Sequence, residues 1–206
     1  MKSCGAVSAP PRRWNHNTHY HPLILGAVPD GCRRSLDVGC GEGMLTRDLR
    51  RVVPHVTGID RDAASVDVAR RQDAGGAVEY IVGDFMTHPF APASFDHIAS
   101  LAALHHMDET AALERMRALL APGGTLAIIG LARNRYPADL PFVLAGAVGH
   151  RVHALSKSCW EDAAPRLWPA PATFAETRRL AQRALPGVGY RRQLLFRYSL
   201  VWTKPA

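Results

Sequence analysis

Three acidic residues stand at the ends of predicted β-strands in the first half of the 206-residue chain. Asp37 precedes a glycine turn at 39–43 that leads from a strand into a helix, and Asp60 and Asp84 end the next two strands. In an open parallel sheet the carboxyl ends of the strands meet at one edge, where folds of this kind bind ligands. A glycine turn there also exposes backbone N–H groups to a ligand. These residues therefore predict a ligand site at that edge.

The glycine spacing separates the possible ligands. A phosphate-binding P-loop requires G-x-x-x-x-G-K-[ST], and no lysine stands near the turn. A dinucleotide turn requires G-x-G-x-x-G/A, but Met44 occupies the last position. Asp37 would repel a pyrophosphate and could instead face a cation. Asp60 lies where a carboxylate accepts both ribose hydroxyls, and Asp84 with Phe85 could bind an adenine ring. The pattern favours a nucleoside that carries positive charge.

Several motifs in order resemble the class I S-adenosylmethionine-dependent methyltransferases. The matching stretches are L-D-V-G-C-G-E-G at 36–43, V-T-G-I-D at 56–60, V-G-D-F at 82–85, F-D-H-I-A-S-L at 95–101 and L-L-A-P-G-G-T-L at 119–126. They cover about residues 35 to 130 in the order and spacing of that family. The resemblance implies S-adenosyl-L-methionine as the cofactor and S-adenosyl-L-homocysteine as the product.

The resemblance also implies a role for each motif. The first acid and the glycines would line the methionine end of the cofactor, the second acid would hold the ribose, and the third acid with its aromatic neighbour would bind the adenine. Residues that follow the fourth strand would face the sulfonium and the incoming acceptor. The cofactor-binding residues are accordingly expected to be Asp37, Gly39, Gly41, Gly43, Asp60, Arg61, Asp84, Phe85, Ser100 and Leu101.

Two adjacent histidines, His105 and His106, come shortly after the fourth predicted strand. Methyl transfer is an in-line displacement at an activated carbon, so the protein has to align the acceptor and remove its proton. Imidazole titrates near neutrality and could take a proton from a phenol, an acid or an amine. Both histidines are therefore candidate catalytic residues, and we expect His106 to be the general base. In the alternative interpretation, one caps the following helix and the other packs against the cofactor.

The leading stretch 14–21 is rich in aromatic and imidazole side chains. It could fold over the cofactor as a lid, exclude water and contact the acceptor. Tyr20 is expected to contact the methionine end of the cofactor. The candidate substrate-binding residues are Trp14, His16, His19 and His105.

Two other interpretations of this stretch stay open. Trp14 and Tyr20 could simply pin a leading helix to the core. The histidines could instead contribute to a metal site, because imidazole suits zinc, iron or nickel. No helical H-x-x-x-H pattern or acidic partner supports the metal, so we assign no metal-ligating residue.

The elements that position these residues follow from the hydrophobic pattern. Apolar β-type runs alternate with helical patterns, which predicts parallel strands joined by right-handed helical crossovers. A Thr173–Glu176 capping box predicts one more helix, to about residue 184. Strands are predicted over 35–38, 56–59, 78–82, 95–100, 125–129, 189–196 and 198–203, and helices over 45–53, 63–72 and 109–120.

The fold class is therefore α/β, a Rossmann-like seven-stranded, mostly parallel sheet with helices on both faces and an antiparallel last strand. We expect one S-adenosylmethionine-dependent methyltransferase domain over 1–206. Residues 1–34 form its leading lid or helix segment, and residues 131–171 are an insertion that caps the substrate. The apolar run 140–148 in this insertion could cover a lipophilic acceptor, contact a second copy in a homodimer, or face the core.

Composition bears on the possible partners and the cellular location of the protein. The net charge of +7 is spread along the chain without a dense basic block, so it is weak support for nucleic acid. The four cysteines show no C-x-x-C pairing, which indicates neither a zinc site nor a disulfide framework. No apolar run approaches the ~20 residues that a membrane span requires. The sequence therefore predicts a cytoplasmic protein without a membrane partner.

The leading functional interpretation is methylation of an O, N or C nucleophile in a small molecule, a metabolite or a natural-product intermediate. An RNA or protein methyltransferase is the alternative, although no basic stretch interleaved with aromatic residues supports stacking on bases. A third interpretation is a protein that binds S-adenosylmethionine without transferring the methyl group, because a fold does not fix a function.

Overall fold

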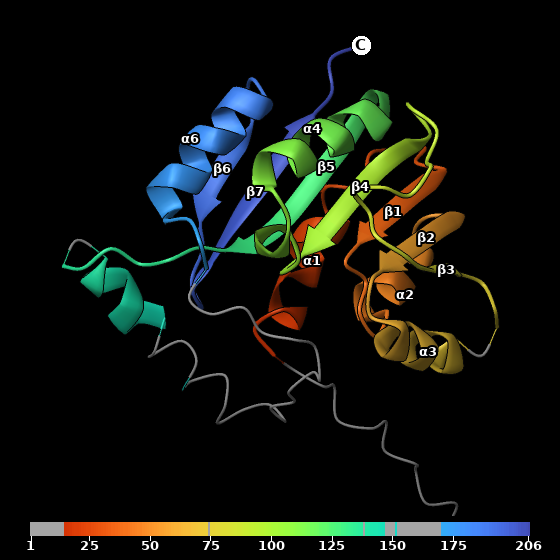
Figure 1. The fold of residues 1–206 in the computed structure, drawn as a ribbon, viewed down its shortest axis with the longest axis horizontal. Helices are drawn as coiled ribbons and strands as arrows, with labels where there is room; N and C mark the ends of the chain where they lie inside the picture. The colour runs from red at the N-terminus through yellow and green to blue at the C-terminus, as the bar shows by residue number, and fades with distance from the viewer. Residues whose placement is uncertain (1–14, 74, 138, 147–150, 152–169) are drawn as a thin grey trace, which may run out of the picture.

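A seven-stranded sheet forms the centre of the protein (Figure 1). The computed structural model describes residues 15–73, 75–137, 139–146, 151 and 170–206. The strands are β1 (Arg34–Val38), β2 (His55–Asp60), β3 (Glu79–Val82), β4 (Phe95–Leu101), β5 (Leu120–Leu131), β6 (Gly189–Arg192) and β7 (Arg197–Thr203). Their order is β3-β2-β1-β4-β5-β7-β6. The first five pair in parallel, and β7 is antiparallel to both β5 and β6. The predicted Rossmann-like sheet with a reversed last strand is confirmed.

Helices cover both faces of this sheet (Figure 1). They are α1 (His21–Leu25), α2 (Met44–Arg50), α3 (Ala63–Gln72), α4 (Glu109–Leu119) and α6 (Phe174–Ala184), with short 3₁₀ turns η1 (Thr18–Tyr20) and η2 (Leu104–His106). The first three pack on one face and α4 and α6 on the other. Side-chain caps begin α3, α4 and α6, and the capping box predicted for α6 is present between Thr173 and Glu176.

The two faces bury separate apolar cores. Between the sheet and α4 and α6, the core includes Ile98 of β4 and Met116 of α4. On the opposite face, Ile24 of α1 and Leu49 of α2 pack against Ile129 of β5. Strands that are buried on both faces are largely apolar, as residues 126–129 of β5 show. The polar residues His97 and Ser100 of β4 are also buried, and each is hydrogen-bonded to β1.

The closing hairpin differs from the prediction. A strand was expected over 189–196, but β6 ends at Arg192 and residues 193–196 form the turn into β7. Leu195 and Phe196 have φ angles of 55° and 63°, in the left-handed region that a strand cannot use. Leu194, Leu195 and Phe196 form an apolar run of a kind that also occurs in strands, so the sequence pattern alone could not place the turn.

The segment after β5 leaves the carboxyl edge of the sheet (Figure 1). It is helical over 140–146, and Arg133 bridges to Thr173 next to α6. The rest of the predicted insertion, 147–150 and 152–169, lies outside the described residues. None of the helices in the described part of the chain has the length and apolar character needed to cross a bilayer.

We predict that Ile98→Ala lowers the free energy of unfolding by about 2–5 kcal/mol, because it leaves a cavity under the fully buried centre of β4. Urea denaturation followed by circular dichroism measures the change. Val52→Ala is the matched control, since the Val52 side chain is 56% exposed and its loss should cost less than about 0.5 kcal/mol. Equal losses in the two variants would contradict this assignment of the core.

Candidate functional site

The glycine turn between β1 and α2 is held against the end of β2. The N–H groups of Gly39 and Cys40 donate to the Ile59 carbonyl at 2.9 and 3.1 Å, and the Gly41 N–H donates to Asp60 Oδ2 at 2.8 Å. Gly39, Gly41 and Gly43 have φ angles of 75°, 49° and 73°. Only glycine adopts this conformation without strain, so the turn needs glycine at each of these positions.

Two of these glycines are also required by close packing. A Cβ at Gly39 would lie 2.2 Å from the Cβ of Ala103, and a Cβ at Gly43 would lie 2.5 Å from the hydroxyl of Tyr80. A Cβ at Gly41 would meet nothing within 4 Å. The turn is therefore packed at its two ends and open at its middle, where a ligand can approach the backbone.

Asp37, the last acidic residue before the turn, is buried with incomplete pairing. It is 1% exposed, and Thr46 Oγ1 of α2 donates to its Oδ2 at 2.6 Å. Its Oδ1 has no hydrogen-bond partner among the residues that the structure describes. Burial raises the pKa of Asp37 to about 6, against the effects of the Thr46 hydrogen bond and of nearby His21. A bound cation would supply the missing partner and favour the ionised carboxylate.

The Asp60 carboxylate is fixed at the carboxyl end of β2. Its Oδ2 accepts from Gly41 N–H, and its Oδ1 accepts from Asp62 N–H at 2.9 Å. Each oxygen keeps a further lone pair, and the side chain is only partly buried. The geometry therefore presents a fixed carboxylate to a ligand, as expected for a group that holds two hydroxyls.

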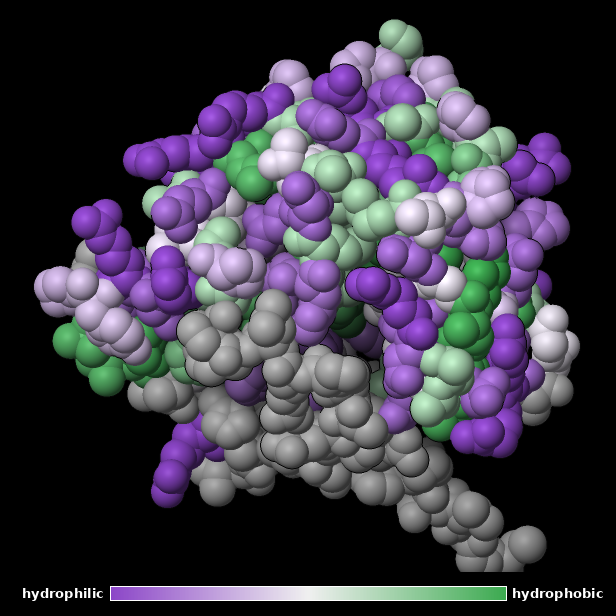
Figure 2. Space-filling model, viewed as in Figure 1, coloured by the Kyte–Doolittle hydropathy of each residue, from purple (hydrophilic) through white to green (hydrophobic). Residues whose placement is uncertain are grey.

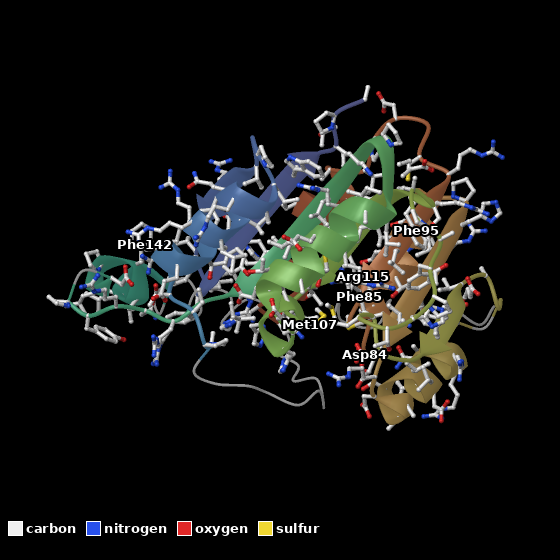
Figure 3. The ribbon with its side chains drawn as sticks, turned by 45° about the horizontal axis from the view of Figure 1, so that its top comes forward. Asp84, Phe85, Phe95, Met107, Arg115 and Phe142 are labelled. Carbon is white, nitrogen blue, oxygen red and sulfur yellow. The ribbon has the colours of Figure 1, made fainter. Side chains whose placement is uncertain are left out.

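Asp84 and Arg61 lie together at the neighbouring strand ends. Arg61 Nη2 is 3.6 Å from Asp84 Oδ2, and Met86 N–H donates to Asp84 Oδ1 at 2.9 Å. Phe85 is buried in the core, and the Arg115 guanidinium lies 5.4 Å from its ring centre (Figure 3). The sequence suggested an exposed apolar face at Phe85, whereas the ring serves the core. Contacts of Asp84, Arg61 and Phe85 with the cofactor stay predictions.

Ser100 and Leu101 lie inside β4 and not after it, which corrects their placement. The Ser100 side chain is fully buried, and its hydroxyl donates to the Val38 carbonyl of β1 at 3.0 Å. This bond ties the ends of the two central strands together, so the Ser100 side chain supports the site from behind. Leu101 is half-buried at the carboxyl end of the strand, where the surface is hollowed (Figure 2).

His105 and His106 form the short turn η2 beyond β4, with ring centres 4.2 Å apart. His105 is buried, and burial together with the charges of His106 and Arg197 lowers its pKa to about 4. His105 is therefore neutral at physiological pH. His106 is exposed. Of the pair, only His106 is open to a molecule that arrives at the edge of the sheet.

The leading stretch packs on the β6–β7 turn. Tyr20 is buried, and its hydroxyl donates to the Leu194 carbonyl at 2.6 Å. His16 lies 6.4 Å from the Phe196 ring, and His19 lies edge-on to Tyr20 at 4.8 Å between ring centres. Trp14 lies outside the described residues. Tyr20 thus has the anchoring role that the sequence left open, and its contact with the cofactor stays a prediction.

The sequence analysis did not predict a hydrogen-bonded pair between α1 and α2. His21 Nδ1 of α1 lies 2.8 Å from Asp48 Oδ2 of α2, and both side chains are largely buried. Burial acts to raise the pKa of Asp48, but the hydrogen bond and charge of His21, with those of Arg51 and Arg47, lower it overall. Thr46, the partner of Asp37, was also missed. Its position in the first turn of α2, facing the end of β1, was the only available signal.

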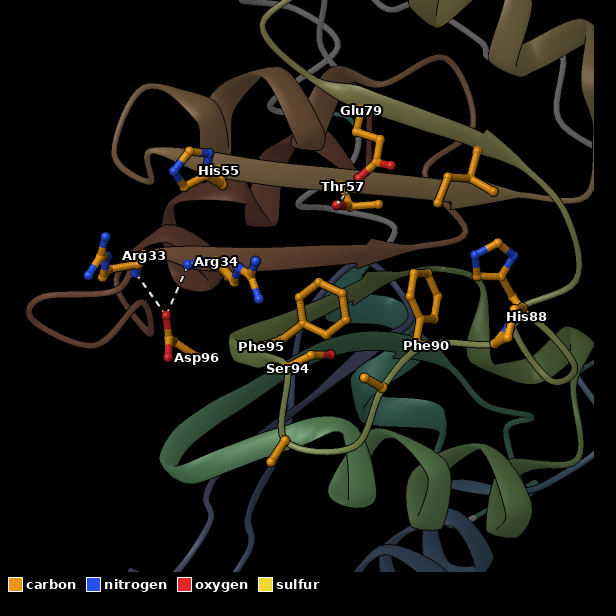
Figure 4. Close-up of a pocket in the computed structure, with 14 residues that line it drawn as sticks. Arg33, Arg34, His55, Thr57, Glu79, His88, Phe90, Ser94, Phe95 and Asp96 are labelled. Carbon is orange, nitrogen blue, oxygen red and sulfur yellow. Dashed lines mark hydrogen bonds between the residues drawn. The ribbon is translucent and has the colours of Figure 1, made fainter.

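A broad hollow at the other edge of the sheet does not belong to this site. It has a volume of about 820 Å³ and lies at the amino ends of β1 to β4, opposite to the glycine turn (Figure 4). Its aromatic floor is formed by Phe90 and Phe95. The acids at its rim are engaged, since Asp96 accepts from the N–H groups of Arg33 and Arg34. We place the functional site by its chemistry, at the carboxyl edge.

The carboxyl edge therefore offers one set of groups to one ligand. An orphaned buried carboxylate oxygen on Asp37 suits a cation, the open backbone at Gly41 suits close approach, and the fixed Asp60 carboxylate suits a diol. Among the residues that the structure describes, no phosphate clamp stands beside them. The residues present fit a positively charged nucleoside such as S-adenosylmethionine.

Comparisons with known proteins agree with this geometry. A family described as "Methyltransferase domain" matches residues 36–128. An uncharacterized methyltransferase of Mycobacterium bovis is 39% identical over 197 residues, covering 93% of this chain and 98% of its own. A ubiquinone biosynthesis O-methyltransferase of Ralstonia nicotianae is 30% identical over 205 residues, covering 92% of this chain and 84% of its own.

A solved structure shares the fold. It is phosphoethanolamine N-methyltransferase 2 of Haemonchus contortus in complex with S-adenosyl-L-methionine. Its TM-score is 0.58 at 19% identity, and the match covers 85% of this chain and 38% of that one. At this identity the likeness extends to the fold alone.

We predict that Asp60→Ala weakens the binding of S-adenosylhomocysteine by roughly 1.5–3 kcal/mol, because two hydrogen bonds to a charged group are lost. Isothermal titration calorimetry measures the change. Asp67→Ala on the exposed side of α3 is the matched control and should leave the affinity unchanged. Unchanged affinity in Asp60→Ala would remove this residue from the site.

The raised pKa of Asp37 predicts a pH dependence of cofactor binding. Below about pH 6 the carboxyl is protonated in the free protein, so binding a cation must first remove that proton. The affinity for S-adenosylhomocysteine, which carries an ammonium group, should therefore fall up to about tenfold per pH unit below pH 6 and be flat above pH 7. In Asp37→Asn the affinity should be lower and should not vary between pH 5 and 7. A wild-type affinity that rises on acidification would show the opposite sign.

Proposed function

The chain belongs to the class I S-adenosylmethionine-dependent methyltransferases, and we propose that it transfers the methyl group to a small molecule, to a hydroxyl oxygen in preference to a nitrogen or carbon. Its cofactor is S-adenosylmethionine. The observation that carries the proposal is the exposed imidazole of His106, placed beyond β4 next to an apolar strand end. A base at this point can take the proton of an acceptor aligned with the methyl group.

Support for oxygen as the acceptor atom comes from the relatives and from the base. The Ralstonia nicotianae relative is named as an O-methyltransferase in ubiquinone biosynthesis, and it is matched along most of its length. A phenol or an acidic hydroxyl has to lose its proton as the new bond forms, and imidazole is suited to accept that proton near neutrality. A protonated amine would first have to lose a proton, because an ammonium nitrogen has no lone pair with which to attack the methyl group.

The residues of the chain divide the work of the reaction. When bound, S-adenosylmethionine supplies a methyl carbon that its sulfonium has already activated. Asp37 and the glycine turn would hold its amino-acid end, Asp60 with Arg61 its ribose, and Asp84 its adenine, with the buried Phe85 supporting that strand end. These contacts fix the direction of the methyl group, and alignment of the two reacting atoms then supplies most of the rate acceleration.

The base and its neighbour have different tasks. His105 is buried and neutral, and its ring packs on that of His106 at 4.2 Å. This contact orients the His106 ring toward the edge of the sheet without adding a positive charge beside it. His106 would accept the acceptor proton, and His105 would support it and border the acceptor.

Two segments would cover the acceptor. The leading segment within 1–34, with Trp14, His16 and His19, would close one side, and the insertion 131–171 would close the other. Loops at the carboxyl edge change between proteins while the scaffold stays fixed, so these segments are expected to decide the acceptor. Exclusion of water by them would protect the reacting centre.

We predict that His106→Ala lowers kcat by roughly two orders of magnitude, because positioned proton transfer contributes about 10²–10⁴ to such reactions. The measurement is S-adenosylhomocysteine release with phenolic, carboxylic and amine acceptors. The cofactor affinity should stay at the wild-type value.

His55→Ala is the matched control, since His55 is the exposed first residue of β2, at the amino edge of the sheet, and should leave turnover unchanged. Wild-type turnover of His106→Ala across pH 6 to 9 would exclude His106 as the base. Release of product by wild-type protein only with amine acceptors would exclude the preference for oxygen.

A further inference from the structure

The β6–β7 hairpin touches both segments that reach the carboxyl edge. These are the leading segment, described here as residues 15–21, and the post-β5 segment, described as residues 132–137 and 139–146. They are more than a hundred residues apart in the chain; the first leads into α1, and the second continues from β5 (Figure 1). Their contacts with the hairpin are of three kinds, on β6, on β7 and on the turn between them.

Arg192 at the end of β6 fastens the post-β5 segment. Its Nη1 lies 2.5 Å from Asp139 Oδ1, and its Nη2 donates to Asn134 Oδ1 at 3.0 Å. The guanidinium also lies 4.1 Å from the ring centre of Phe142 and 4.1 Å from that of Phe174. Both members of the ion pair are largely buried, so the pair is less screened than a surface pair. One side chain of β6 thus contacts three residues of the post-β5 segment and one residue of α6.

The leading segment is fastened to the turn and to β7. Tyr20 Oη donates to the Leu194 carbonyl, and Arg197 Nη2 donates to Asn17 Oδ1 at 2.9 Å. Asn17 precedes the 3₁₀ turn η1 and Tyr20 is its last residue, so these two hydrogen bonds hold both ends of the turn against the hairpin. The hairpin is therefore the anchor for this segment as well.

Phe196 lies between the two segments. Its ring centre is 6.4 Å from the His16 ring on the leading side. On the other side the ring lies close to the Gly146 backbone, since a Cβ built at Gly146 would come within 3.4 Å of Phe196 Cζ. Phe196 and Leu195 both have positive φ, a conformation that is unfavourable for a non-glycine residue. A bulky ring held in this conformation is maintained by the packing on both of its sides.

We propose that Phe196 is a positioning residue that couples the leading segment to the post-β5 segment, so that the two covers of the acceptor site are placed together. The role in the reaction rests on the proposed function, in which these segments cover the acceptor. The coupling itself rests only on the contacts of Phe196. If either segment is displaced, the Phe196 ring loses its neighbour on that side. The ring can then move, which weakens its contact with the other segment.

Hydrogen exchange read by mass spectrometry tests the coupling on the full chain with S-adenosylhomocysteine bound. The central variant is Arg192→Ala, which removes the anchor of the post-β5 segment and the contact with Phe174 of α6, while none of the described contacts of Arg192 reaches residues 15–21. Exchange should become faster in residues 139–146, and also roughly two- to tenfold faster in residues 15–21, which Arg192 does not contact. Arg191→Ala, an exposed neighbour in the same strand, should change neither segment.

Phe196→Gly is the second variant, and together with Arg192→Ala it makes a double-mutant cycle. Glycine suits the φ of 63°, so the ring is removed while the turn is kept. Both segments should exchange faster in this variant. When Arg192→Ala is then added, the effect on residues 15–21 should disappear while the effect on residues 139–146 remains.

Unchanged exchange of residues 15–21 in Arg192→Ala would overturn the coupling, and so would an unchanged effect in the Phe196→Gly background. These readouts need no acceptor, so they stand even if the proposed reaction fails. With an acceptor in hand, Phe196→Gly should raise its KM about two- to tenfold at unchanged cofactor affinity. An unchanged KM beside the expected exchange pattern would overturn the positioning role alone and leave the reaction intact.

Discussion

The hydrogen bond from Gly41 N–H to Asp60 Oδ2 joins the two parts of the structure on which the site depends. It fixes the middle of the glycine turn to the end of the neighbouring strand, and the Ile59 carbonyl fixes the beginning of the same turn. The turn can take this path only with glycine at the three positions of positive φ. The direction of α2, and with it the position of Thr46 beside Asp37, follows from that path.

The buried Asp37 carboxyl gives this arrangement its chemical meaning. A carboxyl with a buried, unpaired oxygen costs stability in a protein that only has to fold. This cost is offset when a cationic ligand pairs with the carboxylate. The raised pKa of Asp37 has the same cause, since burial disfavours the ionised carboxylate as long as no cation lies beside it. His21 and Asp48 pair with each other, and the Asp37 Oδ1 atom has no partner among the described residues. The positive φ angles of Leu195 and Phe196 are a second feature that costs stability, and these residues lie where the two covering segments meet.

Sequence patterns predicted the parallel sheet, the reversed last strand and the acids at the strand ends, because these depend on periodicity and on local motifs. Contacts between distant segments could not be predicted in this way. Thr46 and His21 act through packing between helices, and Phe85 turned out to serve the core because Arg115 of a later helix lies over it. The turn at 193–196 was predicted as strand, since its run of apolar residues does not show that the backbone reverses there. Ser100 was placed beyond a strand that in fact contains it.

Calorimetric titration of the wild-type protein with S-adenosylmethionine, S-adenosylhomocysteine and NAD tests the central claim most directly. The account predicts that the two sulfur nucleosides bind at one site per chain and that NAD does not, because the turn lacks a pyrophosphate clamp and carries Asp37 in its place. Binding of NAD, or failure of both sulfur nucleosides to bind, would contradict the assignment of the glycine turn and of every residue placed around it.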